Sequence, residues 1–110
     1  MIEEIIKNYL DGHLNVPSFL VRPENPPDKY VLFEKTGGSE LNHIDGATFA
    51  FQSYAPSLFE AAKLNVHVKA YLNEMIFFTG ISKAKLNSDY NYTDPETKEY
   101  RYQAVYDFTY

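Results

Sequence analysis

The stretch that decides the fold is Tyr100-Arg101-Tyr102-Gln103-Ala104-Val105-Tyr106-Asp107-Phe108-Thr109-Tyr110. Its residues alternate between the two faces of a β-strand. One face carries Tyr102, Ala104, Tyr106, Phe108 and Tyr110, and the other carries Arg101, Gln103, Val105, Asp107 and Thr109. We therefore predict a strand over residues 100–110 in a half-exposed sheet. Its partner should lie over residues 84–93, because Asp94-Pro95-Glu96-Thr97 places proline at the first central position of a turn.

A second hairpin is expected earlier in the chain. Residues 30–35 have strand composition, and residues 46–54 alternate with a period of two. Gly37, Gly38 and Ser39 predict a flexible hairpin end, followed by a polar connection over residues 40–45. Prolines surround residues 19–22, so any strand there must be short and lie at a sheet edge.

Two helices complete the predicted fold. Apolar residues from Ile2 to Leu10 recur at helical spacing, and Gly12 should end that helix. The second helix should run from Ser57 to Phe77, with Ser57 and Glu60 forming a capping box. The resulting order, α-β-β-α-β-β, predicts a single α+β domain over residues 1–110. Its two helices should pack on a mostly antiparallel sheet.

Composition excludes several classes of function. The net charge is −5 and the basic residues are scattered singly, which argues against a protein that grips nucleic acid. The absence of cysteine excludes disulfides, thiolate metal sites and cysteine nucleophiles, and it suits a reducing cytoplasm. The sequence begins with alternating acids and isoleucines rather than a signal peptide pattern, and no apolar run reaches the roughly 20 residues that a membrane span needs. We expect a soluble chain without a membrane partner.

Candidates for catalysis are sparse. His43-Ile44-Asp45 could place an imidazole and a carboxylate together, as a metal site or an acid–base pair requires, although a polar loop is the simpler interpretation. The segment Lys35 to Ser39 lacks the residue order of a phosphate-binding loop. We therefore expect no enzyme, no cofactor and no bound metal.

The tyrosines are the unusual feature of the composition. The chain has ten tyrosines and no tryptophan, and six of the tyrosines fall within residues 90–110. Tyrosine is enriched at protein interfaces, because it combines a large apolar face with a polar tip. Aromatic residues also simply fit strands. The two interpretations are compatible, and both remain open at this point.

Four blocks of sequence after Tyr30 carry a resemblance to a known family. They are Glu34 to Gly38, Asn42 to Ala55, Ser57 to Ala62, and Leu86 to Asp94 together with Tyr100 to Asp107. These blocks resemble small virion proteins from the head-tail gene cluster of long-tailed bacteriophages, especially those of Gram-positive hosts. Members serve as tail terminators or as tail-completion, minor capsid or head-tail joining proteins. The α-β-β-α-β-β fold of the tail terminators agrees with the order predicted above.

The resemblance implies a structural subunit rather than an enzyme. Copies of the chain would form a homohexameric ring that caps the tail tube, stops its polymerisation and joins the tail to the head connector. The other partners would be the tail tube protein and the head-closure or connector protein, with DNA passing through the lumen without specific binding. The protein would reside at the tail-head interface of the virion, and in the host cytoplasm during assembly.

A ring repeats one heterologous contact, so each subunit needs two different surfaces. We expect the C-terminal hairpin to supply one surface, and the long helix or the first hairpin to supply the other. The expected interface residues are Tyr90, Tyr92, Arg101, Tyr102 and Tyr106 in the hairpin, and Val66 and Tyr71 in the helix. The loops Gly37-Gly38-Ser39 and Asp94-Pro95-Glu96 are expected to dock on the tube or the connector.

Three alternatives remain. The nearest is another neck component, such as a head-closure, adaptor or minor capsid protein. A small α+β ligand-binding module or enzyme would need a pocket with converging polar groups. A host-directed phage regulator would be monomeric and absent from virions.

Overall fold

A computed structural model describes residues 1–41 and 44–110. The predicted α+β fold and its element order are confirmed, with one short additional strand. The elements are α1 (Ile2–His13), β1 (Ser18–Phe19), β2 (Tyr30–Leu41), β3 (Ile44–Tyr54), α2 (Leu58–Glu74), the 3-10 helix η1 (Met75–Phe77), β4 (Lys83–Asn91) and β5 (Arg101–Thr109).

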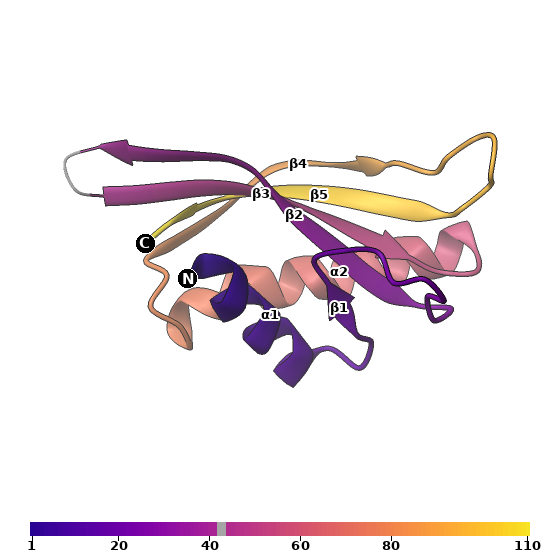
Figure 1. Cartoon of the computed structure of the whole chain (residues 1–110), viewed down its shortest axis with the longest axis horizontal. Coiled ribbons are helices and arrows are strands. Elements are labelled where there is room, and N and C mark those ends of the chain that lie inside the picture. The colour runs from indigo at the N-terminus through magenta and orange to yellow at the C-terminus, as the bar shows by residue number, and fades with distance from the viewer. Residues whose placement is uncertain (42–43) are drawn as a thin grey trace.

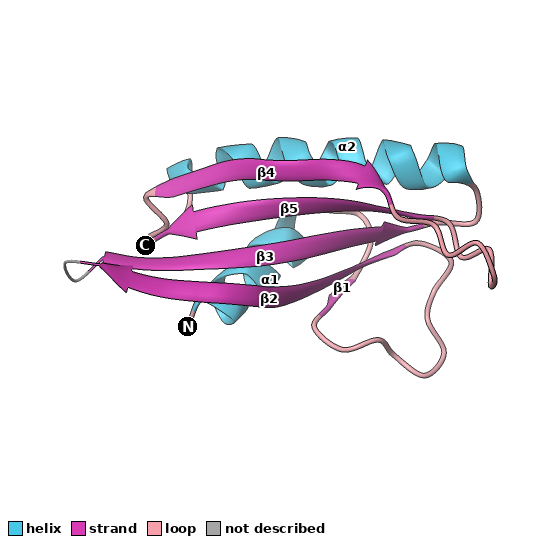
Figure 2. Ribbon diagram, turned by 90° about the horizontal axis from the view of Figure 1, so that it is seen from above, coloured by secondary structure: helices cyan, strands magenta, loops and turns pink. Residues whose placement is uncertain are grey.

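The strands form one sheet in the order β1-β2-β3-β5-β4. The two residues of β1 pair in parallel with β2 at the sheet edge, and every other pairing is antiparallel. Both helices lie against the same face of this sheet (Figure 1). The opposite face is left uncovered by helices (Figure 2). The molecule therefore has two layers, and we call the uncovered side the open face.

The core lies between the helices and the aromatic face of the sheet. Five aromatic side chains from β2, β3 and β5 are at most 2% exposed: Phe33, Phe49, Phe51, Tyr106 and Phe108. Their rings pack edge to face or in tilted and offset stacks, with centroids 5.6 to 6.2 Å apart. Ile6 and Leu10 of α1 and Val68 and Leu72 of α2 close the other side. Burying each such side chain contributes roughly 1.5–3 kcal/mol.

The helix boundaries follow local chemistry with two corrections. The second helix was predicted to reach Phe77, but α2 ends at Glu74 and the last three residues form η1. Gly12 does not end α1 but lies within its last turn, and the helix continues to His13. Ser57 caps α2 as predicted, because its Oγ accepts a hydrogen bond from the Glu60 amide at 3.2 Å. The other half of the capping box is replaced, since the Glu60 carboxylate pairs with Lys29 at 2.8 Å.

The structure corrects the prediction of a loop at Gly37, Gly38 and Ser39. These residues lie within β2 and pair with Thr48, Ala47 and Gly46 of β3. The predicted polar connection over residues 40–45 is corrected as well, because residues 40, 41, 44 and 45 continue the two strands. A bulge between Lys35 and Gly37 absorbs one residue and allows pairing to continue through the glycines. A hairpin projects past the helices as a result (Figure 1). We call its far part, residues 37–41 of β2 and 44–47 of β3, the arm.

Candidate functional site

The open face near the β4–β5 turn gathers aromatic, amide and guanidinium groups from three strands. Strand register places Gln52, Gln103 and Tyr90 in one row across the sheet. Tyr54 and Arg101 occupy the next row. Tyr92 extends that row just beyond β4, where its amide donates to the Arg101 carbonyl at 2.9 Å. We call this group of side chains the tyrosine–arginine cluster.

The first row is a chain of side-chain hydrogen bonds. Gln52 Nε2 donates to Gln103 Oε1 at 2.8 Å, and Gln103 Nε2 donates to the Tyr90 hydroxyl. Gln103 is 8% exposed, so these bonds satisfy an amide that would otherwise be buried without partners. The row therefore holds the Tyr90 hydroxyl against the sheet.

Arg101 is the centre of the second row. Its Nε donates to the Tyr92 carbonyl at 2.7 Å, and its Nη1 donates to the Tyr54 hydroxyl at 2.9 Å. The guanidinium also lies 4.6 Å from the Tyr92 ring centroid and 5.6 Å from the Tyr54 ring centroid. Among the residues that the structure describes, no carboxylate lies within 4.0 Å of it. Arg101 is thus a positioned cation that makes no ion pair with the described residues, although its charge contributes to the lowered pKa of the Asp94 carboxyl.

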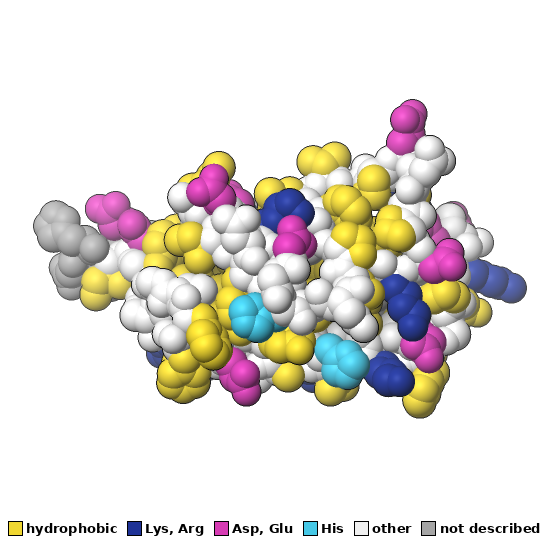
Figure 3. Space-filling view, turned by 90° about the horizontal axis from the view of Figure 1, so that it is seen from below, with side chains coloured by type: hydrophobic (Ala, Val, Ile, Leu, Met, Phe, Trp, Pro, Cys, Tyr) yellow, Lys and Arg dark blue, Asp and Glu magenta, His cyan; other side chains and the backbone are white. Residues whose placement is uncertain are grey.

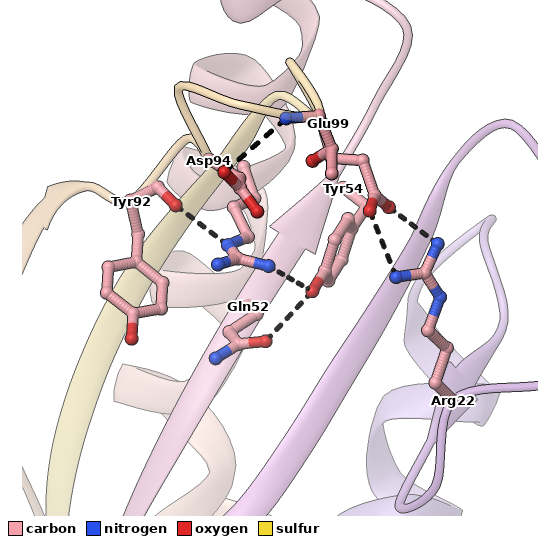
Figure 4. Close-up of polar contacts among 8 residues, drawn as sticks. Arg22, Gln52, Tyr54, Tyr92, Asp94 and Glu99 are labelled. Carbon is pink, nitrogen blue, oxygen red and sulfur yellow. Dashed lines mark hydrogen bonds and ion pairs between the residues drawn. The ribbon is translucent and has the colours of Figure 1, made fainter.

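A second arginine ties two loops together over Tyr54. Arg22 donates two hydrogen bonds to the Glu99 carboxylate, at 3.1 and 2.6 Å, from the far side of Tyr54 as seen from Tyr92 (Figure 4). The Glu99 hydrogen bond raises the pKa of Arg22. Below this pair the rings of Tyr54 and Tyr30 stack with centroids 4.6 Å apart and planes 5° from parallel. The Arg22–Glu99 ion pair joins the segment after β1 to the turn before β5.

The turn at Asp94, Pro95 and Glu96 is confirmed. The Asp94 carboxylate accepts hydrogen bonds from the Glu96 amide at 2.9 Å and the Thr97 amide at 3.5 Å, and the first of these lowers the pKa of Asp94. The turn is one residue longer than a β-turn, because the Lys98 amide bonds to the Asp94 carbonyl at 2.8 Å. Lys98 adopts a positive φ of 56° to close it. Its docking role stays a prediction.

The structure brings together only part of the expected interface. The Tyr90 and Tyr92 rings meet edge to face at 5.8 Å, each side chain is 42% exposed, and Arg101 lies beside Tyr92. Tyr102 alternates onto the helix side with Ala104. Val66 and Tyr71 also lie on the helix side, where Val66 is exposed and Tyr71 packs 5.5 Å from the His13 ring.

Tyr106 is a correction to the expected interface. Its side chain is fully buried in the core, and its hydroxyl donates to Asn73 Oδ1 at 2.8 Å. The same hydroxyl lies 3.3 Å from the Lys69 carbonyl. Tyr106 shares its strand face with Ala104 and Phe108, and that face is the one the helices cover. It therefore contributes to stability rather than to an exposed surface.

We expect Tyr106→Phe to lower the free energy of unfolding at neutral pH by about 1 kcal/mol, because Asn73 loses its hydrogen-bond donor. Burial raises the pKa of Tyr106 from 10.0 to about 12. Folding thus favours the neutral phenol. Its contribution to the free energy of unfolding is fully present below pH 10 and is lost as the pH rises through 12. Urea unfolding at several pH values should show a steeper loss of stability above pH 10 in the wild type than in the variant. Parallel curves would contradict the assignment.

The helix side holds the remaining candidates for chemistry. Figure 3 shows histidine side chains among hydrophobic ones on this face. His13 and His67 line a groove of about 420 Å³ between the helices, and His13 Nδ1 lies 2.8 Å from the Tyr9 carbonyl. No group of three or more metal-binding side chains occurs within the described ranges 1–41 and 44–110. The candidate His43-Asp45 pair cannot be placed, because His43 lies outside the described residues.

Comparison with known proteins gives no match to a protein-family model and no match to a curated protein sequence. In the described part of the chain, no helix is both long enough and apolar enough to cross a membrane.

Proposed function

We propose that the chain is a structural virion protein of a long-tailed bacteriophage. Its copies form a ring that caps the tail tube, stops tube polymerisation and joins the tail to the head connector. The observation that carries the proposal is the presence of two dissimilar surfaces on one small domain, the tyrosine–arginine cluster and the arm. A closed ring of identical subunits is built from one heterologous contact, which needs two such surfaces.

The composition of the cluster supports an interface. Tyrosine and arginine are over-represented among the residues that dominate binding energy, and they work best when a partner excludes water around them. Tyr90 and Tyr92 are each 42% exposed. Their rings pack against each other, Gln103 donates a hydrogen bond to the Tyr90 hydroxyl, and Arg101 donates one to the Tyr92 carbonyl, so these side chains are already restricted. Little side-chain entropy is then lost on binding, which favours association. The role in the virion is proposed from the resemblance of the four sequence blocks to phage head-tail proteins.

The proposed partners follow from the ring. They are further copies of the chain, the tail tube protein and the head-closure or connector protein, at the tail-head interface of the virion. DNA would pass through the lumen unbound, and the net charge of −5 suits a lumen that repels phosphate. A cryo-EM reconstruction with a basic lumen would contradict this part of the proposal.

We expect the arm at Gly37, Gly38 and Ser39 and the turn at Asp94, Pro95 and Glu96 to contact the tube or the connector. Gly37, Gly38 and Ser39 are exposed, and the turn projects from the opposite end of the sheet (Figure 2). Amide hydrogen exchange in both segments should slow when polymerised tail tube protein is added, because docking would restrict opening of their hydrogen bonds. Exchange that is unchanged in both segments would contradict this docking.

The proposed function is tested by polymerising the tail tube protein with and without the chain and imaging the products by negative stain. A terminator should shorten the tubes as its concentration rises and should appear as a ring at tube ends. Tubes of unchanged length would exclude the terminator role. If rings then bind the head connector instead, the chain is another neck component.

A further inference from the structure

The arm carries two carboxylates that directly oppose each other. Glu40 of β2 and Asp45 of β3 are register partners, so their side chains lie on the same face of the hairpin, and both residues are exposed. Like charges in directly opposite positions of an antiparallel pair are destabilising. Neither residue takes part in an ion pair within the described chain. The basic residue of β2 on this face, Lys35, has its side chain against Gly38.

The two carboxylates lie on the underside of the arm, which is the side that faces the helix layer in the body. Alternation along β3 fixes this, because Ala47 and Phe49 point into the core and Asp45 precedes them by two and four residues. The arm extends beyond the helices (Figure 1), and Glu40 and Asp45 are both exposed, so no helix covers the two carboxylates. The two carboxylates therefore form an exposed acidic surface on the side of the sheet opposite to the open face.

Arg101 lies at the other end of the same strand pair. The β3–β5 ladder runs from Gly46 opposite Thr109, next to the arm, to Tyr54 opposite Arg101. Eight residues of strand separate these two ends, which is about 27 Å at 3.4 Å per residue. The unpaired carboxylates and the unpaired guanidinium therefore cannot meet within one subunit.

We propose that the arm of one copy lies with its underside over the open face of the next copy, so that Glu40 and Asp45 meet Arg101. The proposal deepens the ring proposed above and rests on it. The arm underside and the open face lie on opposite sides of the sheet, so the underside of one copy can lie on the open face of the next. Repeating that step is a heterologous, head-to-tail contact that closes into a ring when the rotation allows it.

The chemistry of the two surfaces suits this contact. A planar guanidinium binds carboxylates through paired N–H donors, and Arg101 keeps Nη2 free of any hydrogen bond within the described residues. At the same end Lys98 adds positive charge and Arg22 neutralises Glu99, while Asp94 and Glu96 in the turn are negative. Tyr90 and Tyr92 would flank the ion pair and exclude water from it. The contact would also relieve the repulsion between Glu40 and Asp45.

Charge reversal tests the contact directly. Sedimentation velocity of the pure chain, up to millimolar concentration, should show head-to-tail association in the wild type. We expect both Arg101→Glu and the double variant Glu40→Arg/Asp45→Arg to weaken association by about tenfold or more. Combining all three substitutions should restore it, because the charges are exchanged rather than lost. Glu74→Arg is the control, since Glu74 is an exposed carboxylate at the end of α2, in the helix layer and outside both the arm and the open face.

A neutral variant separates this contact from a fold defect. Glu40→Gln/Asp45→Asn removes the repulsion within the arm, so thermal stability should stay the same or rise while self-association falls. A loss of both stability and association would show that the carboxylates support the fold, and would overturn the proposal.

The outcomes also separate the contact from the proposed function. Rings that form equally well in the charge-reversed variants would overturn the contact and leave the ring intact. If charge reversal weakens association and the triple exchange restores it, but the chain does not change tube length, the contact is supported and the terminator role is excluded. A wild type that stays monomeric at millimolar concentration would overturn the contact.

Discussion

Phe51→Ala is expected to lower the free energy of unfolding by about 3–5 kcal/mol. The Phe51 ring is fully buried at the centre of the core, within 6.2 Å of the ring centroids of Phe33, Phe49, Tyr106 and Phe108. Removing it leaves a cavity that strand and helix cannot readily close, because the neighbouring rings are held by the sheet. A domain of this size has only about 5–15 kcal/mol of total stability, so a large share would be lost.

Urea unfolding followed by circular dichroism measures this loss. Phe59→Ala is the matched control, because Phe59 on α2 is 75% exposed. The control should change stability by less than about 0.5 kcal/mol. Similar midpoints for the two variants would mean that the aromatic face of the sheet is not the core.

Tyr90→Ala/Tyr92→Ala is expected to abolish ring assembly while leaving the fold intact. These rings are 42% exposed on the open face and pack against each other and, for Tyr92, against Arg101. Their removal would delete the apolar surface around the guanidinium and admit water to the contact. Light scattering should report monomers at concentrations where the wild type forms rings.

Phe59→Ala again supplies the control, since it removes an exposed aromatic from the helix layer rather than from the open face. Circular dichroism must show that the double variant is folded. Rings that persist in the folded double variant would rule out these tyrosines as part of the subunit interface.

The fold could be predicted because its signals are local and repeated. Alternation over residues 100–110 and 46–54 and the apolar spacing from Ile2 to Leu10 each specify one element, and all three elements are present. The capping role of Ser57 depends on residues only three apart and was also predictable. Gly37-Gly38-Ser39 was predicted wrongly, because its composition suits a turn while pairing with β3 across a bulge keeps it in a strand.

The error at Tyr106 has a different cause. Alternation separates the two faces of a strand but does not say which face the helices will cover. The strand from Arg101 to Thr109 has aromatic residues on one face and polar and aliphatic residues on the other. Phe108 and Ala104, on the same face as Tyr106, were the available signal that this face is the core.

The contacts in and around the tyrosine–arginine cluster could not be predicted from the sequence, because they depend on distant segments. The Arg22–Glu99 pair joins residues 77 positions apart. Tyr54 reaches Arg101 only because β3 and β5 are neighbours in the sheet, although they are not consecutive in the chain. Such contacts follow from topology, which local patterns do not determine.

The central claim is that this chain works as a ring, and its mass in solution tests that claim most directly. Multi-angle light scattering should be recorded for the purified protein alone and again after mixing with tail tube protein. The account predicts a closed oligomer in at least one of the two conditions, with rings visible at tube ends. A monomer in both conditions would contradict it.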